Sequence, residues 1–455
     1  MAHIVCVTGG LTGIFNASLA LIEQLLKAGH HVTYASPADF SEALSAERIP
    51  FVQLAPWVIQ SGDPPMGRWE KLRKLRSRQD RAIAAFGTEH FADTITGLLP
   101  DLVLIDIEMH PHIMAAVTAE LPVALLCPFI SIWKRPHLPP ISTGIVPGEG
   151  WRGSRVGIEL SWFQHGWNGW MSAQRERWRR MGLDRLSVLR RYAQKLGHPF
   201  NRAYGFSQWL VPYPHEDLPI LCLNAQELAF ESKPHPLMHY VGPSVAAQRK
   251  DLRVTAETKA SLEQLFAKIS SRHHSSERPL IYCGCSSFMR GSEQFLQQVV
   301  AAVAQRPDWT LVIGLGGRQD PSELSPLPEN VQAFNWTPQL QVLSHADCAI
   351  INSGAHSIAE CIHFGVPMLA YSLENACQNG NAARVKYHGL GIVGDLAQDS
   401  AAQIQGYLQQ LLERDDYRQR VKEFSDRTRI YGQENRAAKI VENIISQVPP
   451  AGVSK

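Results

Sequence analysis

The sequence lacks several features that would place it in a special class of protein. Its 455 residues contain no apolar run of roughly 18 residues or more, and the start MAHIVCVTGG has no charged segment, apolar core or cleavage site. Eight cysteines form no CxxC pair and lie mostly inside apolar runs, which excludes a disulfide framework and indicates buried thiols in a reducing compartment. We therefore expect a cytoplasmic protein, and a peripheral contact with a membrane stays open.

The chain also has little net charge and no visible internal repeat. The 44 basic and 42 acidic side chains leave a net charge of +2, too small a global field to make nucleic acid the expected partner. No internal repeat with a period of roughly 20 to 50 residues is visible, which excludes a solenoid or propeller. The length is that of two ordinary domains.

Short β-branched runs alternate with helical patterns along the chain. HIVCVT, ASLALIEQLLKAGH and HVTYAS give strand, helix and strand, and the rhythm begins again after Pro212 with LPILCLN. This pattern predicts an α/β protein with two tandem, Rossmann-like, doubly wound parallel sheets. We place an N-terminal domain at 1–215, a C-terminal domain at 219–435, and a closing helix at 436–455.

Tryptophans gather in one part of the N-terminal half. Seven of the eleven lie between residues 129 and 210, which suggests an insertion at about 130–210. An aromatic-lined acceptor pocket, a membrane-facing edge, and ordinary packing of irregular helices all fit this density.

The stretch 330–385 has the strongest chemical signal. The run CAIIN predicts a strand, SGAH a tight turn, and a helix follows near Ser357, so backbone N–H groups and the helix dipole would converge as a diphosphate requires. A generic α/β turn would look similar.

The same stretch resembles the C-terminal signature of family 1 glycosyltransferases of the GT-B fold. The matching residues are Trp336, Pro338, Gln339, Leu343, His345, Gly354, Ser357, Glu360, Gly365, Val366, Pro367, Gln378, Asn381, Ala382 and Val385. YVGPSV at 240–245, RPLIYCGCSSF and GQENRAAKIVENI extend the resemblance toward both ends of the chain, and in the family the last helix often crosses back onto the N-terminal domain.

The resemblance implies specific roles. Trp336 would stack on the nucleobase, Glu360 would hold ribose hydroxyls, and the turn Asn352, Ser353, Gly354, His356 and Ser357 would bind the diphosphate, with Gly13, Ser287, Gln339 and Gln378 completing the donor site. It also implies a nucleotide-diphosphate sugar as co-substrate, UDP-glucose being the favoured one, transfer of a hexose with inversion, and no cofactor or metal. We expect a small hydrophobic acceptor, whose path the tryptophan cluster would line.

Four positions depart from the family pattern. Asn352 and His356 stand where histidine and asparagine are usual, as though exchanged, and Cys377 replaces the acidic residue that binds sugar hydroxyls. Glu374 could substitute for that acid or be a solvated loop charge, and Ser286 replaces a glycine.

The N-terminal run GIFNASLALIEQLLKAGHHVT aligns without gaps to the family pattern, but the histidine that acts as general base falls on Ile14, which cannot accept a proton. Asp106 matches the aspartate that orients this histidine, and we hypothesise that Asp106 or His110 is the base. Alternatively, Asp106 caps the following helix, with His110 and His112 on the surface, or no strong base is needed.

Two other functions compete. The start VTGGLTGI resembles the glycine-rich loop of short-chain dehydrogenases, but Phe15 occupies the final glycine position and no YxxxK spacing is present. A catalytically silent GT-B homologue that acts as a nucleotide-binding partner would also explain Ile14.

Finally, the basic runs 68–81 and 175–191 could dock on anionic lipid or form solvated helix faces.

Overall fold

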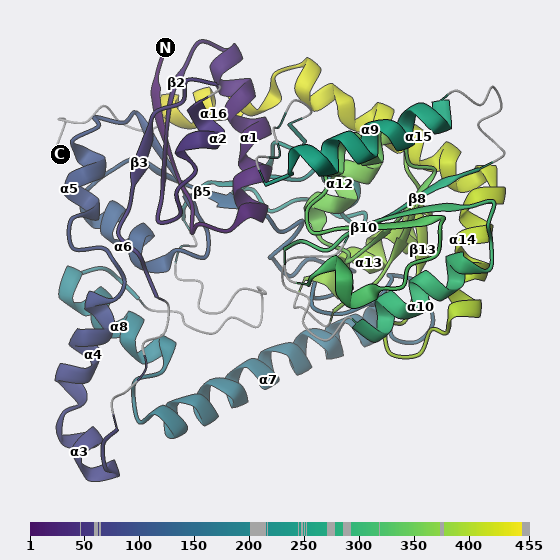
Figure 1. Cartoon of the computed structure of the whole chain (residues 1–455). Coiled ribbons are helices and arrows are strands. Elements are labelled where there is room, and N and C mark those ends of the chain that lie inside the picture. Colours follow the sequence, from purple (N-terminus) through teal and green to yellow (C-terminus); the bar gives the residue numbers. More distant parts are fainter. Residues whose placement is uncertain are drawn as a thin grey trace.

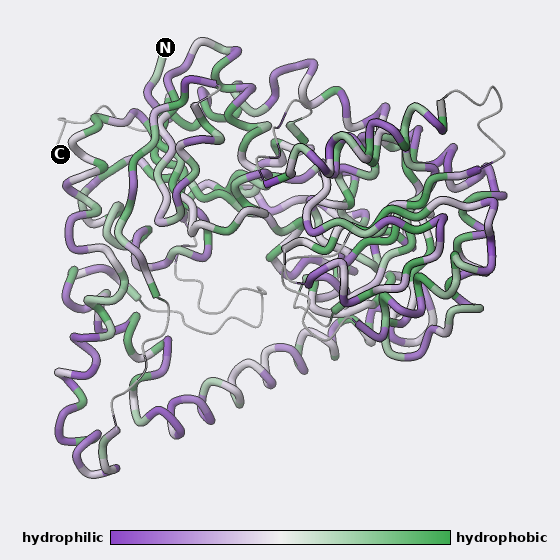
Figure 2. Tube along the Cα trace, viewed as in Figure 1, coloured by the Kyte–Doolittle hydropathy of each residue, from purple (hydrophilic) through white to green (hydrophobic). Residues whose placement is uncertain are grey.

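A computed structural model gives the fold, and it describes residues 1–45, 47–58, 62, 65–200, 215, 217–243, 245–246, 249, 251, 253–270, 278–284, 293–317, 319–373 and 377–447. Two parallel sheets, each flanked by helices, face one another (Figure 1). Their strands are the most continuous apolar segments, with polar residues gathered on the surrounding helices and loops (Figure 2). The expected architecture of two doubly wound α/β units is confirmed.

The first sheet has the strand order β3-β2-β1-β4-β5-β6-β7, and all its pairings are parallel. Its strands are β1 (His3–Val7), β2 (His31–Ser36), β3 (Phe51–Gln53), β4 (Leu102–Asp106), β5 (Val123–Cys127), β6 (Ile220–Cys222) and β7 (Met238–Tyr240). The helices of this half are α1 (Thr12–Lys27), α2 (Ser41–Ser45), α3 (Arg68–Arg73), α4 (Leu75–Ala84), α5 (Phe91–Thr96), α6 (His110–Thr118), α7 (Arg155–Arg180) and α8 (Arg185–Leu196).

The second sheet has the order β10-β9-β8-β11-β12-β13, again parallel. Its strands are β8 (Leu280–Gly284), β9 (Thr310–Gly314), β10 (Val331–Phe334), β11 (Cys348–Ile351), β12 (Met368–Ala370) and β13 (Gly391–Val393). The helices from here to the end are α9 (Ala256–Ser270), α10 (Glu293–Ala304), α11 (Gln339–Leu343), α12 (Ala355–Phe364), α13 (Gln378–Tyr387), α14 (Ala401–Glu413), α15 (Asp415–Gln433) and α16 (Arg436–Gln447).

The boundary between the halves lies later than the sequence pattern predicts. The run LPILCLN, expected to open the C-terminal domain at residue 219, forms β6 of the first sheet, where Ile220 pairs with Leu125 of β5. β7 then pairs with β6, so the first sheet ends at Tyr240. The apolar pattern of a buried strand does not indicate which sheet the strand joins. The sequence pattern alone therefore assigned β6 to the wrong half.

The last helix packs against the first half. Val441 and Ile444 of α16 are buried in the same apolar cluster as Leu21 of α1, and the backbone N–H of Ala437 donates to Oε1 of Gln24 at 3.0 Å. Residues 448–455 of the expected closing segment lie outside the described residues.

The tryptophan-rich segment divides into buried and exposed members. Trp133 and Trp162 are buried, and the Trp162 indole N–H donates to the carbonyl of Leu138 at 2.7 Å. Trp167 and Trp178 are exposed on α7, whereas Trp209 lies outside the described residues. Packing therefore explains some of these side chains and leaves the exposed ones unexplained.

Two expectations from composition can be compared with the described part of the chain. Six of its seven cysteines are buried and none forms a disulfide. None of the helices described here combines the length and the apolar character needed to cross a lipid bilayer.

Candidate active site

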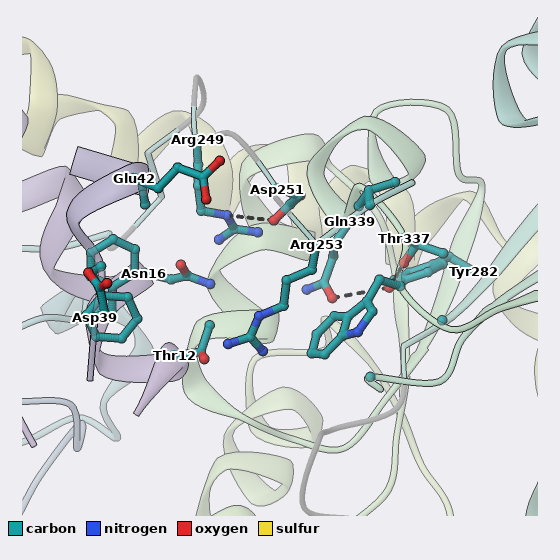
Figure 3. A pocket seen from close by; sticks show the side chains of 17 residues that line it. Thr12, Asn16, Asp39, Glu42, Arg249, Asp251, Arg253, Tyr282, Thr337 and Gln339 are labelled. Carbon is teal, nitrogen blue, oxygen red and sulfur yellow. Dashed lines mark hydrogen bonds and ion pairs between the residues drawn. The ribbon is translucent and has the colours of Figure 1, made fainter. Parts of the chain in front are cut away.

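A cavity of about 390 Å³ lies between the two halves, within the size range of small-ligand sites (Figure 3). The first half contributes α1, α2 and the loop before α2, and the second contributes the loops after β9 and β10. A segment that joins the halves closes one side. The lining residues are Thr12, Phe15, Asn16, Asp39, Phe40, Glu42, Ala43, Arg249, Asp251, Arg253, Val254, Tyr282, Gly314, Gly316, Trp336, Thr337 and Gln339.

Trp336 presents its indole to this cavity just after β10. It lies against the turn at Gly317, whose φ is +77° and where a Cβ would come within 2.4 Å of the ring, so only glycine lets the indole pack there. The guanidinium of Arg253 lies 4.8 Å from the ring centroid, in cation–π contact. Figure 3 shows the side chain of Arg253 among those that line the cavity. Arg253 therefore covers aromatic surface on which a nucleobase would stack.

Glu360, on α12, is wholly buried and accepts bonds from three side chains. Oε1 lies 2.8 Å from Nη1 of Arg249 and 3.0 Å from Nε2 of His356, and Nε2 of Gln339 donates to Oε2. Burial alone would raise the pKa of Glu360, but His356 and Arg249 outweigh it and lower the pKa to about 2. Glu360 is thus a carboxylate whose oxygens are already engaged, and a ribose diol could bond to it only in exchange for one of these three partners.

The turn after β11 provides donors for an anion. Asn352 is 8% exposed, and its amide nitrogen has no hydrogen-bond partner among the described residues. Ser353 has a φ of +51°, and the turn is held by its Oγ, which donates to the carbonyl of Tyr371 at 2.7 Å, and by Asn381, whose Nδ2 donates to the Ser353 carbonyl at 2.9 Å. Gly354 then precedes α12 without a side-chain cap, so the first N–H groups of the helix remain available.

The remaining predicted donor residues fall in different places. Ser357 is half-buried in the first turn of α12. Gln378 begins α13 and accepts from the N–H of Leu373 at 2.8 Å through Oε1, which fixes the loop before it. Gly13 is exposed in the first turn of α1 and does not line the cavity. Ser287, Ser286 and Glu374 lie outside the described residues.

The candidate bases of the first half are buried. Asp106 ends β4 at 5% exposure, and its Oδ1 accepts from the N–H of Glu108 at 3.1 Å. Burial, and then the charge of Glu108, raise the pKa of Asp106 to about 7. Ile14 packs into the apolar cluster of this half and has no proton-accepting atom. Asp106 therefore has a pKa close to neutral pH, and it does not line the described cavity.

The interpretation of His110 and His112 as surface residues is wrong. His110 is 3% exposed, and its Nδ1 lies 3.3 Å from Nε2 of His215. Burial, with His215 and Arg185 nearby, lowers the pKa of His110 well below its usual value, so it is neutral. His112 is wholly buried between Trp57 and Phe91 in edge-to-face contacts, where burial lowers its pKa to about 4. Both are interior residues of α6, which packs against α5 and α8.

Sequence reasoning missed the cationic segment between the halves. Arg249 and Arg253 belong to a polar stretch to which the sequence pattern assigns no role, yet both line the cavity. Their spacing after YVGP carries no familiar motif. Only the packing of the two halves shows that this stretch lines the cavity.

Comparisons with known proteins agree with this geometry. A family model described as "Erythromycin biosynthesis protein CIII-like, C-terminal domain" matches residues 297–444. Oleandomycin glycosyltransferase of Streptomyces antibioticus is 25% identical over 403 residues, 88% of this chain and 80% of that protein. Zeaxanthin glucosyltransferase of Pantoea ananas is 25% identical over 468 residues, 99% of this chain and 97% of that protein. The crystal structure of the glycotransferase of kitacinnamycin has a TM-score of 0.69 at 21% identity, covering 98% of this chain and 99% of that one.

The fold and these matches define a glycosyltransferase with two Rossmann-like domains facing across a cleft, the GT-B fold. Within that class, the chain resembles glycosyltransferases of the natural-product type, both in its C-terminal domain and over most of its length.

Proposed function

We propose that this glycosyltransferase moves a hexose from a nucleotide-diphosphate sugar to a small hydrophobic acceptor, with inversion and without a bound metal or cofactor. The donor assignment rests on three kinds of side chain at the carboxyl edge of the second sheet: an aromatic ring, an amide and a carboxylate. The indole of Trp336 follows β10 and lines the cavity with Gln339 and Arg249, both of which bond to Glu360. The unpartnered amide of Asn352 follows β11, just before α12. Ligands of open α/β sheets bind at this carboxyl edge.

The donor we favour is UDP-glucose. A planar indole suits uracil, the start of α12 with Asn352 suits a diphosphate, and a carboxylate suits a diol. The glucose transfer named for the Pantoea ananas relative supports a hexose, and zeaxanthin in that name supports a hydrophobic acceptor. Such an acceptor would partition into membranes, so a peripheral membrane contact of this otherwise cytoplasmic enzyme belongs to the same proposal.

Asp106 is the base that we favour over His110. Inversion requires the acceptor oxygen to lose its proton as it attacks the anomeric carbon, while the nucleoside diphosphate leaves with the electron pair of the broken bond. A carboxylate with a pKa of about 7 accepts a proton more readily than an ordinary aspartate does. His110 is neutral, but its Nδ1 is engaged with His215.

Thermal shift followed by turnover tests the proposal. UDP and UDP-glucose should raise the melting temperature, because a ligand bound only by the native state stabilises it, whereas ADP should raise it less. Incubation with UDP-glucose and a panel of hydrophobic alcohols should then yield a β-glucoside, whose anomeric configuration is read by NMR. Binding without transfer to any acceptor would instead support the catalytically silent partner, and absence of binding would refute the donor assignment.

A further inference from the structure

Exposed tryptophans are confined to one region of the described structure. All five of them lie on α3, on α7 or just before α7: Trp69 (86% exposed), Trp151 (68%), Trp167 (50%), Trp170 (39%) and Trp178 (83%). Tryptophan is usually largely buried in globular proteins. Such a concentration of exposed indoles therefore calls for a partner.

Helix α7 adds an apolar stripe to these indoles. Its exposed residues Val156, Leu160, Phe163, Trp167 and Trp170 recur at intervals of four and three residues, which places them on one helical face. The Phe163 and Trp167 rings lie 6.4 Å apart, and the Trp167 and Trp170 rings 5.4 Å apart. Buried positions are confined to its first turns, so most of the helix extends beyond the core, as Figure 1 shows.

Positive charge concentrates at one end of this surface, beside Trp69 and Trp178. The segments 68–81 and 175–191 each carry seven basic and two acidic side chains, a net +5 apiece in a chain whose total is only +2. Arg78 brings them together, because its Nη2 donates to the carbonyl of Arg180 at 3.0 Å. Glu70 pairs with Lys74, and Glu176 pairs with Arg180. Exposed cations remain at Arg68, Arg73, Arg76, Arg175, Arg177 and Arg179.

We propose that α3 and α7 form a surface that docks peripherally on bilayers containing anionic lipid. Indoles favour the boundary between headgroups and acyl chains, and arginines beside them reach the phosphates. Each basic residue near an anionic surface strengthens binding roughly fivefold. An anionic lipid bilayer is the partner that we infer, because it can interact with the exposed apolar side chains and with the excess of cations.

Other partners fit the surface less well. Pairing of two copies through α7 would bring two surfaces of high positive charge together, which costs free energy. Single-stranded nucleic acid would use the arginines and indoles, but the aliphatic Val156 and Leu160 offer it neither charge nor a stacking face. Only a lipid interface uses all three kinds of side chain.

Vesicle co-sedimentation of the full chain tests the proposal. Vesicles of phosphatidylcholine with about 30% phosphatidylglycerol should bind the protein in low salt, and vesicles of phosphatidylcholine alone should bind it far more weakly. The triple variant Arg175→Glu, Arg177→Glu, Arg179→Glu should lose about 100-fold or more in partitioning, at roughly fivefold for each cation removed. The double variant Trp69→Ser, Trp178→Ser should bind more weakly at every salt concentration.

A matched control carries the same change of charge elsewhere. Lys259, Lys422 and Lys439 are exposed on α9, α15 and α16, and their replacement by glutamate should leave most of the vesicle binding intact. Far-UV circular dichroism melts check that each variant is folded. Equal losses in both triple variants, or no binding of wild type to anionic vesicles, would overturn the proposal. So would a dimer in light scattering that the tryptophan variant dissociates, or tighter binding to single-stranded RNA than to anionic vesicles.

Discussion

The two halves of the molecule share one architecture but differ in how closely they follow the glycosyltransferase pattern. In the second half, Trp336, Gln339 and Glu360 lie together around a hydrogen-bonded network at the edge of the sheet. In the first half, Ile14 occupies the position of the usual base and belongs to the core, while Asp106 is buried with a raised pKa. The second half thus keeps the polar groups that the family pattern predicts, whereas the first half has a buried carboxylate with a raised pKa in place of the usual histidine.

Removal of Glu360 should have the largest effect on the donor half. Glu360→Ala leaves Arg249 and His356 without their buried carboxylate, and breaking a buried ion pair by deleting one partner costs about 3–5 kcal/mol. Urea denaturation measures the loss of unfolding free energy. Glu423→Ala, at an exposed position on α15, should change it by less than about 0.5 kcal/mol. A loss below about 1 kcal/mol in Glu360→Ala would show that the network does not hold this half together.

Asp106→Asn tests whether the first half supplies the base. A positioned general base contributes about 10²–10⁴-fold, so turnover of UDP-glucose with a hydroxyl acceptor should fall by that factor while nucleotide affinity is unchanged. Asp93→Asn, exposed on α5, serves as the control and should keep wild-type turnover. Wild-type turnover in Asp106→Asn would show that this carboxylate is not the general base, and His110 would then be the remaining candidate.

The same carboxylate predicts a pH dependence of opposite sign for turnover and stability. Turnover should rise with pH through about 7, as Asp106 ionises. Stability should fall between about pH 4 and 7, because the folded pKa exceeds the unfolded one and the buried group prefers its proton. Melting curves of wild type and Asp106→Asn at pH 5 and pH 8 check this, with the variant gaining relative to wild type at pH 8. No relative gain would mean that burial does not raise this pKa.

Ile14→His introduces the histidine that is usual in the family at this position. The variant tests whether a histidine there is sufficient to act as the general base. Ile14 is 6% exposed in the apolar cluster, so an imidazole there should cost about 1–3 kcal/mol and should not raise turnover. Ile14→Val, which keeps the site apolar, should cost about 1 kcal/mol. Urea melts and initial rates measure both variants. A gain in turnover would show that the helix start of α1 can still present a base to the acceptor.

The sequence predicts the two sheets and the donor turn because both depend on local patterns. Alternating apolar runs define strands, and the short stretch from Asn352 to Ser357 carries its own strand, turn and helix start. The placement of β6 and of Arg249 depends on contacts between distant segments, which no local pattern encodes. The burial of His110 likewise results from the packing of α6 against α8. A polar residue at this position in the sequence does not by itself predict that burial.

Arg253→Ala should give the smallest effect and tests the base subsite most directly. The guanidinium covers the Trp336 ring, and a cation–π contact at an exposed site contributes about 0.5–1 kcal/mol. If UDP must displace Arg253 to stack on the indole, the variant should bind UDP about two- to fivefold more tightly in isothermal titration. Arg253→Lys keeps the charge and part of the contact, so its affinity should lie between. Weaker binding in Arg253→Ala would instead mean that the guanidinium closes over the bound nucleotide, and the donor site would then be completed by the joining segment rather than obstructed by it.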